Sequence, residues 1–205
     1  SIAASAICFG VIGKSGCLPA VSPAPVTAQE IITLLFIDVF CSILFLIGEQ
    51  VSIFLKTGRV KSEWADYNGH MNLAFYIHLF DGAWETLLEN FNIGEESAIN
   101  QKRTTFAVES HTTYDMEVKV GDEVDLNLLF IDRDKKRLVY KLQMIQKEKK
   151  YLASTTEVCS LYVDLDKRKV TEFEDEKLAL IDKFIKENAP QFEPGELHLI
   201  KKLKK

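Results

Sequence analysis

The stretch Asp66-Tyr67-Asn68-Gly69-His70-Met71-Asn72 stands directly ahead of a long apolar segment with helical spacing. It places a carboxylate, two amides and an imidazole within seven residues. A carboxylate just ahead of a helix N-terminus is typical of hydrolytic chemistry. The acid can attack an electrophile or activate water, and the free N–H groups of the first helical turn can hold a developing oxyanion.

The apolar segment predicts one long helix from Asn72 to Phe91. Its apolar residues recur at helical spacing and leave little polar face, which is typical of a buried helix. The residues that set this spacing are Ile77, Phe80, Ala83, Trp84, Leu87, Leu88 and Phe91. Asn72 can cap the start of the helix, and Gly94 lies just past its end.

The segments around this helix predict one strand before it and four after it. The first strand spans 51–63, and the later strand-like runs span 104–114, 123–131, 138–144 and 151–163. The polar connections 132–136 and 147–150 are short, as hairpin turns are. We therefore expect an α+β fold in which an antiparallel sheet, including a four-strand meander, wraps around the central helix. An amphipathic helix over 174–188 follows the sheet.

Composition indicates a single domain with extensions. The chain has 205 residues, 47% of them hydrophobic, which supports a sizeable core. A net charge of −5 offers no basic excess for nucleic-acid binding. The four cysteines form no CxxC pair, so we expect no metal site, no disulfide framework and a reducing, cytoplasmic setting. We divide the chain into an apolar N-terminal extension (1–50), a central domain (51–170) and a C-terminal helix with a basic, solvated tail (171–205).

The N-terminal extension differs from the rest of the chain in its charge. Residues 1–50 contain only four charged side chains, and 31–47 is nearly all apolar. That run borders on the ~20 residues needed to span a bilayer. Three interpretations stay open: a membrane anchor, a helix packed on the domain or on a partner, and an extension foreign to the functional protein. An anchor would leave the domain facing the cytoplasm, because three basic residues follow the run closely.

Residues 51–200 resemble the hotdog-fold acyl-CoA thioesterases of the 4-hydroxybenzoyl-CoA thioesterase type. The stretch 66–72 carries this resemblance, and it is also similar to the D-x-N-x-H signature of plant acyl-ACP thioesterases. A more specific resemblance, through 64–71, 108–114 and 132–138, is to the thioesterase domain found fused to carnitine dehydrogenase and proposed to act on betainyl-CoA. The chain departs from that group because it contains no GxGxxG nucleotide fingerprint.

The resemblance implies a catalytic set in and just after the stretch 66–72. Asp66 is the expected nucleophile or general base, with an ordinary pre-helix turn acid as the alternative. A thioester carbonyl is electrophilic and thiolate leaves readily, so one carboxylate and one oxyanion hole can suffice. The backbone N–H of Leu73 matches the family's oxyanion donor. His70 could orient the acid or polarise the carbonyl, and Asn68 could position water or the acyl group. A structural role in the turn is the alternative for His70.

Two further acids extend the catalytic candidates. Glu109 and His111 share one face of the predicted strand 104–114. Glu109 is therefore a second catalytic or orienting acid, and His111 a substrate contact, or both are solvent-facing strand residues. Related enzymes can carry their acid on the central helix, which makes Glu85 a fallback.

The remaining candidates are substrate contacts. Asn72 is either a substrate ligand or the helix cap. Trp64 and Tyr67 either belong to the core or form a cation–π cage for a quaternary ammonium group. Arg133 and Lys136 either meet the phosphates of coenzyme A or form a solvated turn.

We expect hydrolysis of a small or medium acyl-CoA to free acid and CoA, with betainyl-CoA as one candidate substrate. No cofactor is expected, because CoA is part of the substrate. The alternatives are an acyl-ACP thioesterase, a hotdog dehydratase or hydratase, and a non-enzymatic acyl-binding module. The resemblance implies a homodimer or a dimer of dimers, with sheets joined edge to edge and the site at the interface, since an exposed sheet edge needs a cover.

Overall fold

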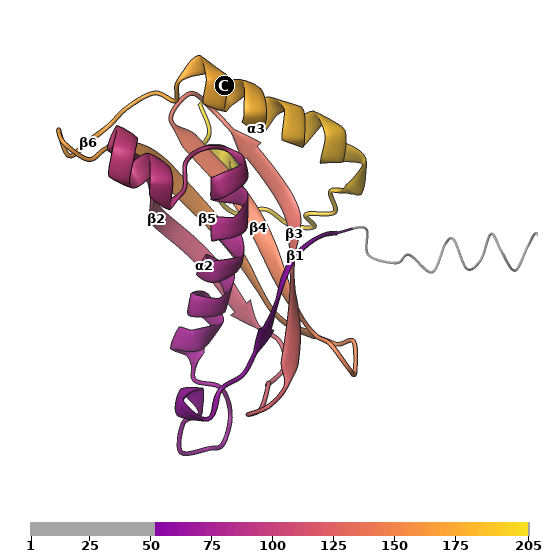
Figure 1. Cartoon of the computed structure of the whole chain (residues 1–205). Helices are drawn as coiled ribbons and strands as arrows, with labels where there is room; N and C mark the ends of the chain where they lie inside the picture. Colours follow the sequence, from indigo (N-terminus) through magenta and orange to yellow (C-terminus); the bar gives the residue numbers. More distant parts are fainter. Residues whose placement is uncertain (1–51, 205) are drawn as a thin grey trace, which may run out of the picture. The chain divides into compact units, whose positions relative to one another are not determined.

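The structure is a computed structural model that describes residues 52–204, in which a curled antiparallel sheet packs around a central helix (Figure 1). It confirms the α+β hotdog architecture that the resemblance implies. The predicted extension over 1–50, with its candidate membrane segment at 31–47, lies outside the described residues. Among the helices of residues 52–204, none combines the length and the apolar character that crossing a membrane requires.

The sheet contains six strands in the described part of the chain. Their bounds are β1 (Ile53–Arg59), β2 (Arg103–Tyr114), β3 (Glu123–Arg133), β4 (Arg137–Gln146), β5 (Leu152–Asp164) and β6 (Lys169–Val170). The strand order is β1-β3-β4-β5-β2, every neighbouring pair is antiparallel, and the short β6 pairs with the end of β5. β1 and β2 are therefore the two edges of the sheet.

The position of β2 corrects the predicted four-strand meander. Of the four strands β2 to β5, only β3, β4 and β5 follow one another through hairpins, whereas β2 pairs with β5 along its whole length. The connection 115–122 explains this crossover, because it passes the N-terminal end of α2 instead of turning back as a hairpin. There Met71 N donates to Val118 O at 3.0 Å, and Val118 N donates to Tyr76 Oη at 3.3 Å. The sheet curls around the helix, so this connection can join its two sides.

The predicted first strand, 51–63, is also too long. β1 ends at Arg59, and a single 3-10 turn, η1 (Ser62–Trp64), follows it. The chain then enters α2 (Leu73–Asn90), whose inner side buries Tyr76, Phe80, Ala83, Trp84 and Leu87. The Trp84 ring stacks on Tyr140 of β4 with centroids 3.5 Å apart. Because this apolar row fixes the helix on the sheet, the N-terminus of α2 is held at one end of the domain.

The C-terminal part of the chain packs on both faces of the sheet. Helix α3 (Asp175–Asn188) contacts the core through Phe184, whose ring meets that of Phe91 at 5.3 Å. Residues 192–204, here called the C-terminal strap, then reach the outer face, where the buried Glu157 carboxylate accepts from His198 N at 2.7 Å and Leu199 N at 2.8 Å. The strap is therefore docked by its backbone at 198–199, and the lysines predicted as a solvated tail are exposed at 201, 202 and 204.

Candidate active site

The loop 65–72 is closed by its own backbone. Ala65 and Met71 form an isolated antiparallel bridge, Asp66 N donates to His70 O at 3.0 Å, and Gly69 N donates to Asp66 O at 3.0 Å. Gly69 has φ +79, a conformation that other residues adopt only with strain. The tight loop therefore depends on the sequence at 66–72 itself. In Figure 1 it lies at the N-terminal end of α2, at the opposite end of the domain from α3.

Asp66 is half-buried, directly ahead of the helix N-terminus. Its carboxylate accepts from Asn68 N at 2.8 Å and faces Asn68 Nδ2 at 3.4 Å. Both contacts come from the loop itself. Asn68 is therefore in place to orient the acid.

The first turn of α2 offers one backbone donor without an intrahelical acceptor, the N–H of Leu73. The Asn72 side chain caps the helix, with its Oδ1 accepting from Ala74 N at 3.0 Å. The N–H of Leu73 begins the helix, so no carbonyl within the helix can accept from it. The structure thus shows Asn72 in the capping role, and it leaves the Leu73 N–H in a position typical of an oxyanion donor.

His70 contacts an acid that sequence reasoning missed. Its Nε2 lies 2.7 Å from the Glu117 carboxylate, which also meets Lys119 Nζ at 3.1 Å. The backbones of His70 and Lys119 form an isolated bridge. The connection 115–122 therefore holds the loop and fixes the imidazole. No local motif marks Glu117 in the sequence, because this contact depends on the crossover of the chain from β2 to β3.

The two predicted aromatic contacts differ in exposure. Trp64 is buried, stacks on Phe75 with centroids 5.2 Å apart, and meets His78 edge-on at 5.5 Å. Tyr67 is 98% exposed at the tip of the loop. Of the two, only Tyr67 presents a free ring face to a ligand.

Glu109 and His111 lie on the outer face of the sheet, away from α2. Glu109 pairs in register with Cys159, which packs with Val139 and Leu199 outside the main core. Its carboxylate meets Lys202 Nζ of the strap at 2.5 Å. The His111 ring lies 4.0 Å from that of His198. Within one chain, both residues are engaged by the C-terminal strap and make no contact with the Asp66 loop.

Arg133 and Lys136 lie at the end of β3 opposite the Asp66 loop. The loop is next to the end of β3 where Glu123 pairs with Arg59. Arg133 forms a two-point ion pair with Asp182 of α3, and Lys136 Nζ lies 3.5 Å from Glu172. In this chain both cations already have acidic partners. A contact with the phosphates of CoA would therefore have to replace these ion pairs.

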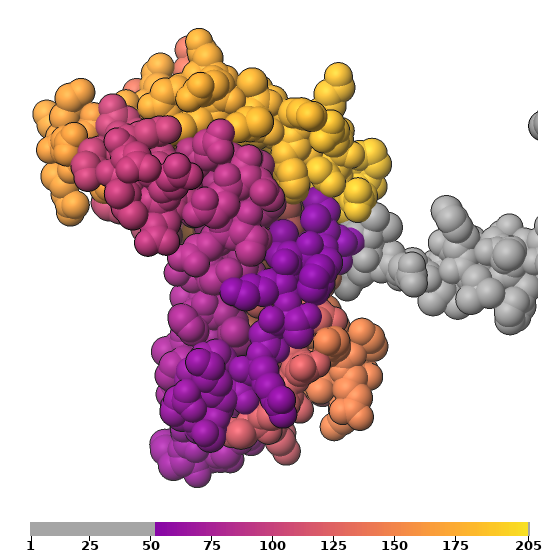
Figure 2. Space-filling model, viewed as in Figure 1, coloured from indigo at the N-terminus to yellow at the C-terminus, as the bar shows by residue number. Residues whose placement is uncertain are grey.

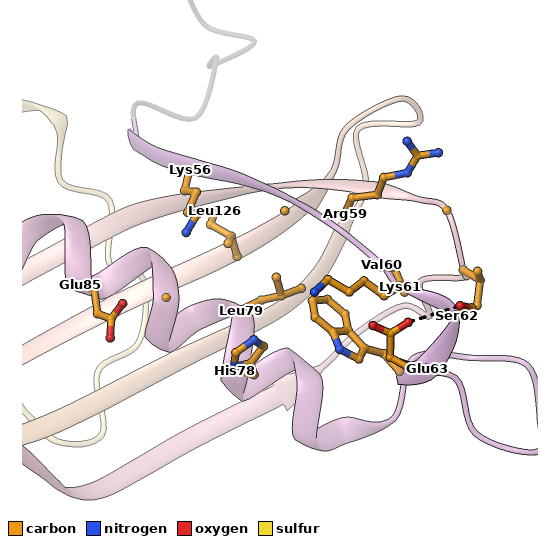
Figure 3. Close-up of a pocket in the computed structure, with 15 residues that line it drawn as sticks. Lys56, Arg59, Val60, Lys61, Ser62, Glu63, His78, Leu79, Glu85 and Leu126 are labelled. Carbon is orange, nitrogen blue, oxygen red and sulfur yellow. Dashed lines mark hydrogen bonds between the residues drawn. The ribbon is translucent and has the colours of Figure 1, made fainter.

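Two hollows flank α2. A groove of about 780 Å³ lies between α2 and β1, and Figure 3 shows Lys56, Lys61, His78 and Glu85 along it, with Leu79 and Leu126 forming an apolar part of its lining. A cavity of about 100 Å³ lies on the other side, between α2 and the inner faces of β2, β4 and β5, and Ile77, Asp81 and Ser110 are among its lining residues. Figure 2 shows α2 at the surface beside β1, with the Asp66 loop below. Neither hollow is lined by Asp66; on α2 the groove begins at His78 and the cavity at Ile77, about one turn past the start of the helix.

Comparison with known proteins matches these features. A family model described as the thioesterase-like superfamily matches residues 60–184. A Pseudomonas aeruginosa betainyl-CoA thioesterase is 29% identical over 123 residues, covering 60% of this chain and 77% of that protein. A Rhizobium meliloti L-carnitine dehydrogenase/betainyl-CoA thioesterase is 26% identical over 106 residues, which are 52% of this chain and 21% of that protein.

A solved structure agrees with this match. A Staphylococcus aureus protein determined in complex with CoA has a TM-score of 0.62 and 26% identity, covering 77% of this chain and 97% of that chain. The family match over 60–184 includes the loop 66–72, all of α2 and strands β2 to β5. With its acid ahead of a capped helix inside a curled sheet, the chain belongs to the thioesterase-like superfamily of hotdog-fold thioester hydrolases.

Proposed function

We propose that this protein hydrolyses acyl-CoA thioesters to a free acid and CoA, with Asp66 as the nucleophile or general base and the Leu73 N–H as the oxyanion donor. The observation that carries the proposal is the Asp66 carboxylate, which accepts from Asn68 N at 2.8 Å and stands ahead of the Leu73 N–H, a first-turn donor of α2 with no acceptor within the helix. These are the two parts that thioester hydrolysis needs, a group to attack or activate water and a site for the oxyanion.

Two routes use the same geometry. In the first, Asp66 attacks the carbonyl carbon and the C–S bond breaks, which releases CoA thiolate and leaves a mixed anhydride that water then hydrolyses. In the second, Asp66 takes a proton from water, the resulting hydroxide attacks, and CoA thiolate leaves directly. In both, the carbonyl oxygen gains negative charge that the Leu73 N–H stabilises. His70 and Asn68 position the loop and its water.

The finer substrate proposal is a small or medium acyl group, with betainyl-CoA as the first compound to try. Its support is the 29% identity to a Pseudomonas aeruginosa betainyl-CoA thioesterase and the exposed Tyr67 ring, which can contact a quaternary ammonium. CoA as the carrier is supported by the Staphylococcus aureus relative determined in complex with CoA. The cytoplasmic setting and the roles of Glu109, His111, Arg133 and Lys136 stay predictions.

The proposed working form is a homodimer that pairs β2 edges. β2 pairs with β5 on one side only, and an apolar strip runs along its free edge and the adjacent side of α2. The members of this β2 edge strip are Phe106, Val108, Tyr114, Met116, Leu73 and Ile77, all of them at least 41% exposed. A second copy would cover the strip, pair the edge and add a wall to the site.

Release of free thiol from a panel of acyl-CoAs, including betainyl-CoA, tests the proposal. We expect hydrolysis by the unmodified protein and a loss in kcat on the order of 10²–10⁴ for Asp66→Asn, which keeps the size of the side chain but removes its charge. Asp166→Asn, an exposed acid in the β5–β6 turn, is the matched control and should keep full activity. Near-normal turnover by Asp66→Asn would contradict the assignment.

The same panel separates the alternatives. A dehydratase or hydratase would change double-bond absorbance without releasing thiol. A binding module would retain acyl-CoA unchanged. Faster release from acyl-ACP than from acyl-CoA would identify the carrier protein as the natural substrate.

A further inference from the structure

Asp81 is an exposed, unpaired acid at the rim of an otherwise uncharged cavity. It lies in the middle of α2 and lines the cavity of about 100 Å³ between this helix and the inner faces of β2, β4 and β5. The other lining residues are Ile77, Phe80, Ala107, Ser110, Tyr140, Leu142, Thr156 and Val158. Within residues 52–204, Asp81 has no ion pair and no hydrogen bond, and no cation lines this cavity.

The other polar side chains that line the cavity carry hydroxyls, and they belong to Ser110, Tyr140 and Thr156. Tyr140 is buried, and burial raises the pKa of its hydroxyl, with the Asp81 charge adding to the effect, so this phenol stays neutral. The Thr156 hydroxyl lies 2.8 Å from that of Thr112. Asp81 is therefore the one carboxylate among the residues that line this cavity.

Helix geometry connects Asp81 to the proposed oxyanion site. Leu73, Ile77 and Asp81 are spaced at i, i+4 and i+8, so they form one ridge along α2. Leu73 is 64% exposed and Ile77 is 41% exposed in one chain. Both belong to the β2 edge strip, so in the proposed dimer the ridge would form one wall of the site and the second copy the other. At 1.5 Å per residue, Asp81 lies about 12 Å along the helix from Leu73. A chain whose carbonyl sits at the Leu73 N–H can therefore run over Ile77 and end at Asp81.

We propose that Asp81 selects acyl groups that carry a cationic end, held by its carboxylate at the far end of an apolar path along Leu73 and Ile77. This rests on the proposed function, because the thioester carbonyl must sit at the Leu73 N–H. The distance favours a spacer of roughly five carbons between the carbonyl carbon and the cation. The ammonium of betainyl-CoA is attached two bonds from the carbonyl carbon, so it is too short to reach Asp81. The longer cation is therefore the better substrate.

The test compares two isosteric substrates that differ only in charge. These are 6-(trimethylammonio)hexanoyl-CoA and its neutral isostere 7,7-dimethyloctanoyl-CoA, with betainyl-CoA as the short cation. We expect the unmodified protein to prefer the long cation over both others by about tenfold in kcat/KM. Asp81→Asn should lower kcat/KM for the long cation by about tenfold and change the neutral isostere less than twofold. Retained activity on the neutral isostere reports that the variant is folded.

Glu176→Gln removes the same charge from an exposed acid of α3 and should leave the preference unchanged. Equal kcat/KM for the two isosteres, or an unchanged preference for the long cation in Asp81→Asn, would overturn the role of Asp81. Hydrolysis of the neutral isostere would still uphold the proposed function in that case. Absence of hydrolysis for every thioester would overturn both. A preference that weakens as salt is raised would support an ion pair.

Discussion

At the residue scale, the site is held by side chains that the sequence marks unequally. Asn68 and Asn72 act within their own loop, on Asp66 and on Ala74 N, so their positions in the sequence predict their contacts. The partner of His70 is Glu117, which follows α2 and β2 in the sequence and meets His70 only through the fold. Local hydrogen bonds can be predicted from spacing, because a turn or a cap has few geometries. Long-range pairs have no such constraint.

Asp134 gives a residue-scale prediction about pH. It lies in the connection 132–136, which the sequence indicated as a polar turn, yet its side chain is 3% exposed. Burial tends to raise the pKa of this carboxyl, but hydrogen bonds from Lys136 N, Lys204 N and Arg137 outweigh it and hold the pKa below its usual range. The charged form is therefore stabilised in the folded protein, which ties the β3–β4 turn to the C-terminal strap.

We expect Asp134→Asn to lower the free energy of unfolding by about 2–3 kcal/mol at pH 7, measured by urea titration. Because the folded-state pKa lies below the unfolded value, this contribution is complete above that value, about 3.9, and disappears as the pH falls through the folded-state pKa. The difference between the two proteins should thus shrink in acid. Asp166→Asn is the exposed control, and an equal loss in it, or a difference that does not vary with pH, would contradict this account.

At the element scale, one buried lysine joins three parts of the chain. Lys177 of α3 is fully buried, and its ammonium donates to Tyr162 Oη of β5 at 2.7 Å. It also donates to Gln101 Oε1 at 2.6 Å and Ser97 Oγ at 3.1 Å, both in the short helical turn η2 (Ser97–Gln101) before β2. Its charge is balanced by Glu174, whose carboxylate lies 3.4 Å away. The start of β2 is thereby fixed to α3 and to β5.

Lys177→Met should lower the free energy of unfolding by about 3–5 kcal/mol, because it removes the buried donor shared by Tyr162 and η2 and one of the two cations that pair with Glu174. Thermal or urea unfolding followed by circular dichroism would measure this. Lys183→Met, on an exposed position of the same helix, is the control and should change stability by less than about 0.5 kcal/mol. A loss in Lys177→Met no larger than in Lys183→Met would show that the network adds nothing.

At the scale of the whole molecule, the free edge of β2 is the surface on which we expect a second copy to bind. The β2 edge strip predicts at least a dimer at micromolar protein concentration, which light scattering on the active species would measure. Val108→Lys places a charge at 55% exposed Val108 and should shift the protein toward monomer, with a loss of activity of about tenfold or more. Val170→Lys, on the exposed β6, should change neither. A fully active monomer would contradict a site shared between copies.

The N-terminal extension gives a second prediction at this scale. Deletion of residues 1–48 should leave a folded, active domain, because the core cluster starts at Val60 and the residues that pack on it start at Ile53. Circular dichroism and the thiol-release assay on the shortened protein would test this. An unfolded or insoluble product in the absence of membranes would mean that the apolar segment 31–47 belongs to the core.

The sequence by itself determined the central helix, most of the strands, the Asp66 loop and the family. Each of these depends on periodicity or on residues close together in the chain, as with the Asn72 cap and the glycine at φ +79 in the loop. Local backbone preference and the burial of one apolar face act within a few residues, so a linear pattern is enough to predict them.

Only the tertiary structure decided which distant segments meet. It put β2 beside β5, brought Glu117 to His70, and turned Glu109 toward Lys202 of the strap. It also left Asp81 unpaired beside the path from Leu73, where the sequence showed only one of several helix acids. The reason is physical: pairing between strands and between charges depends on how the sheet curls around α2, and that curl is set by the packing of the whole core rather than by any local run of residues.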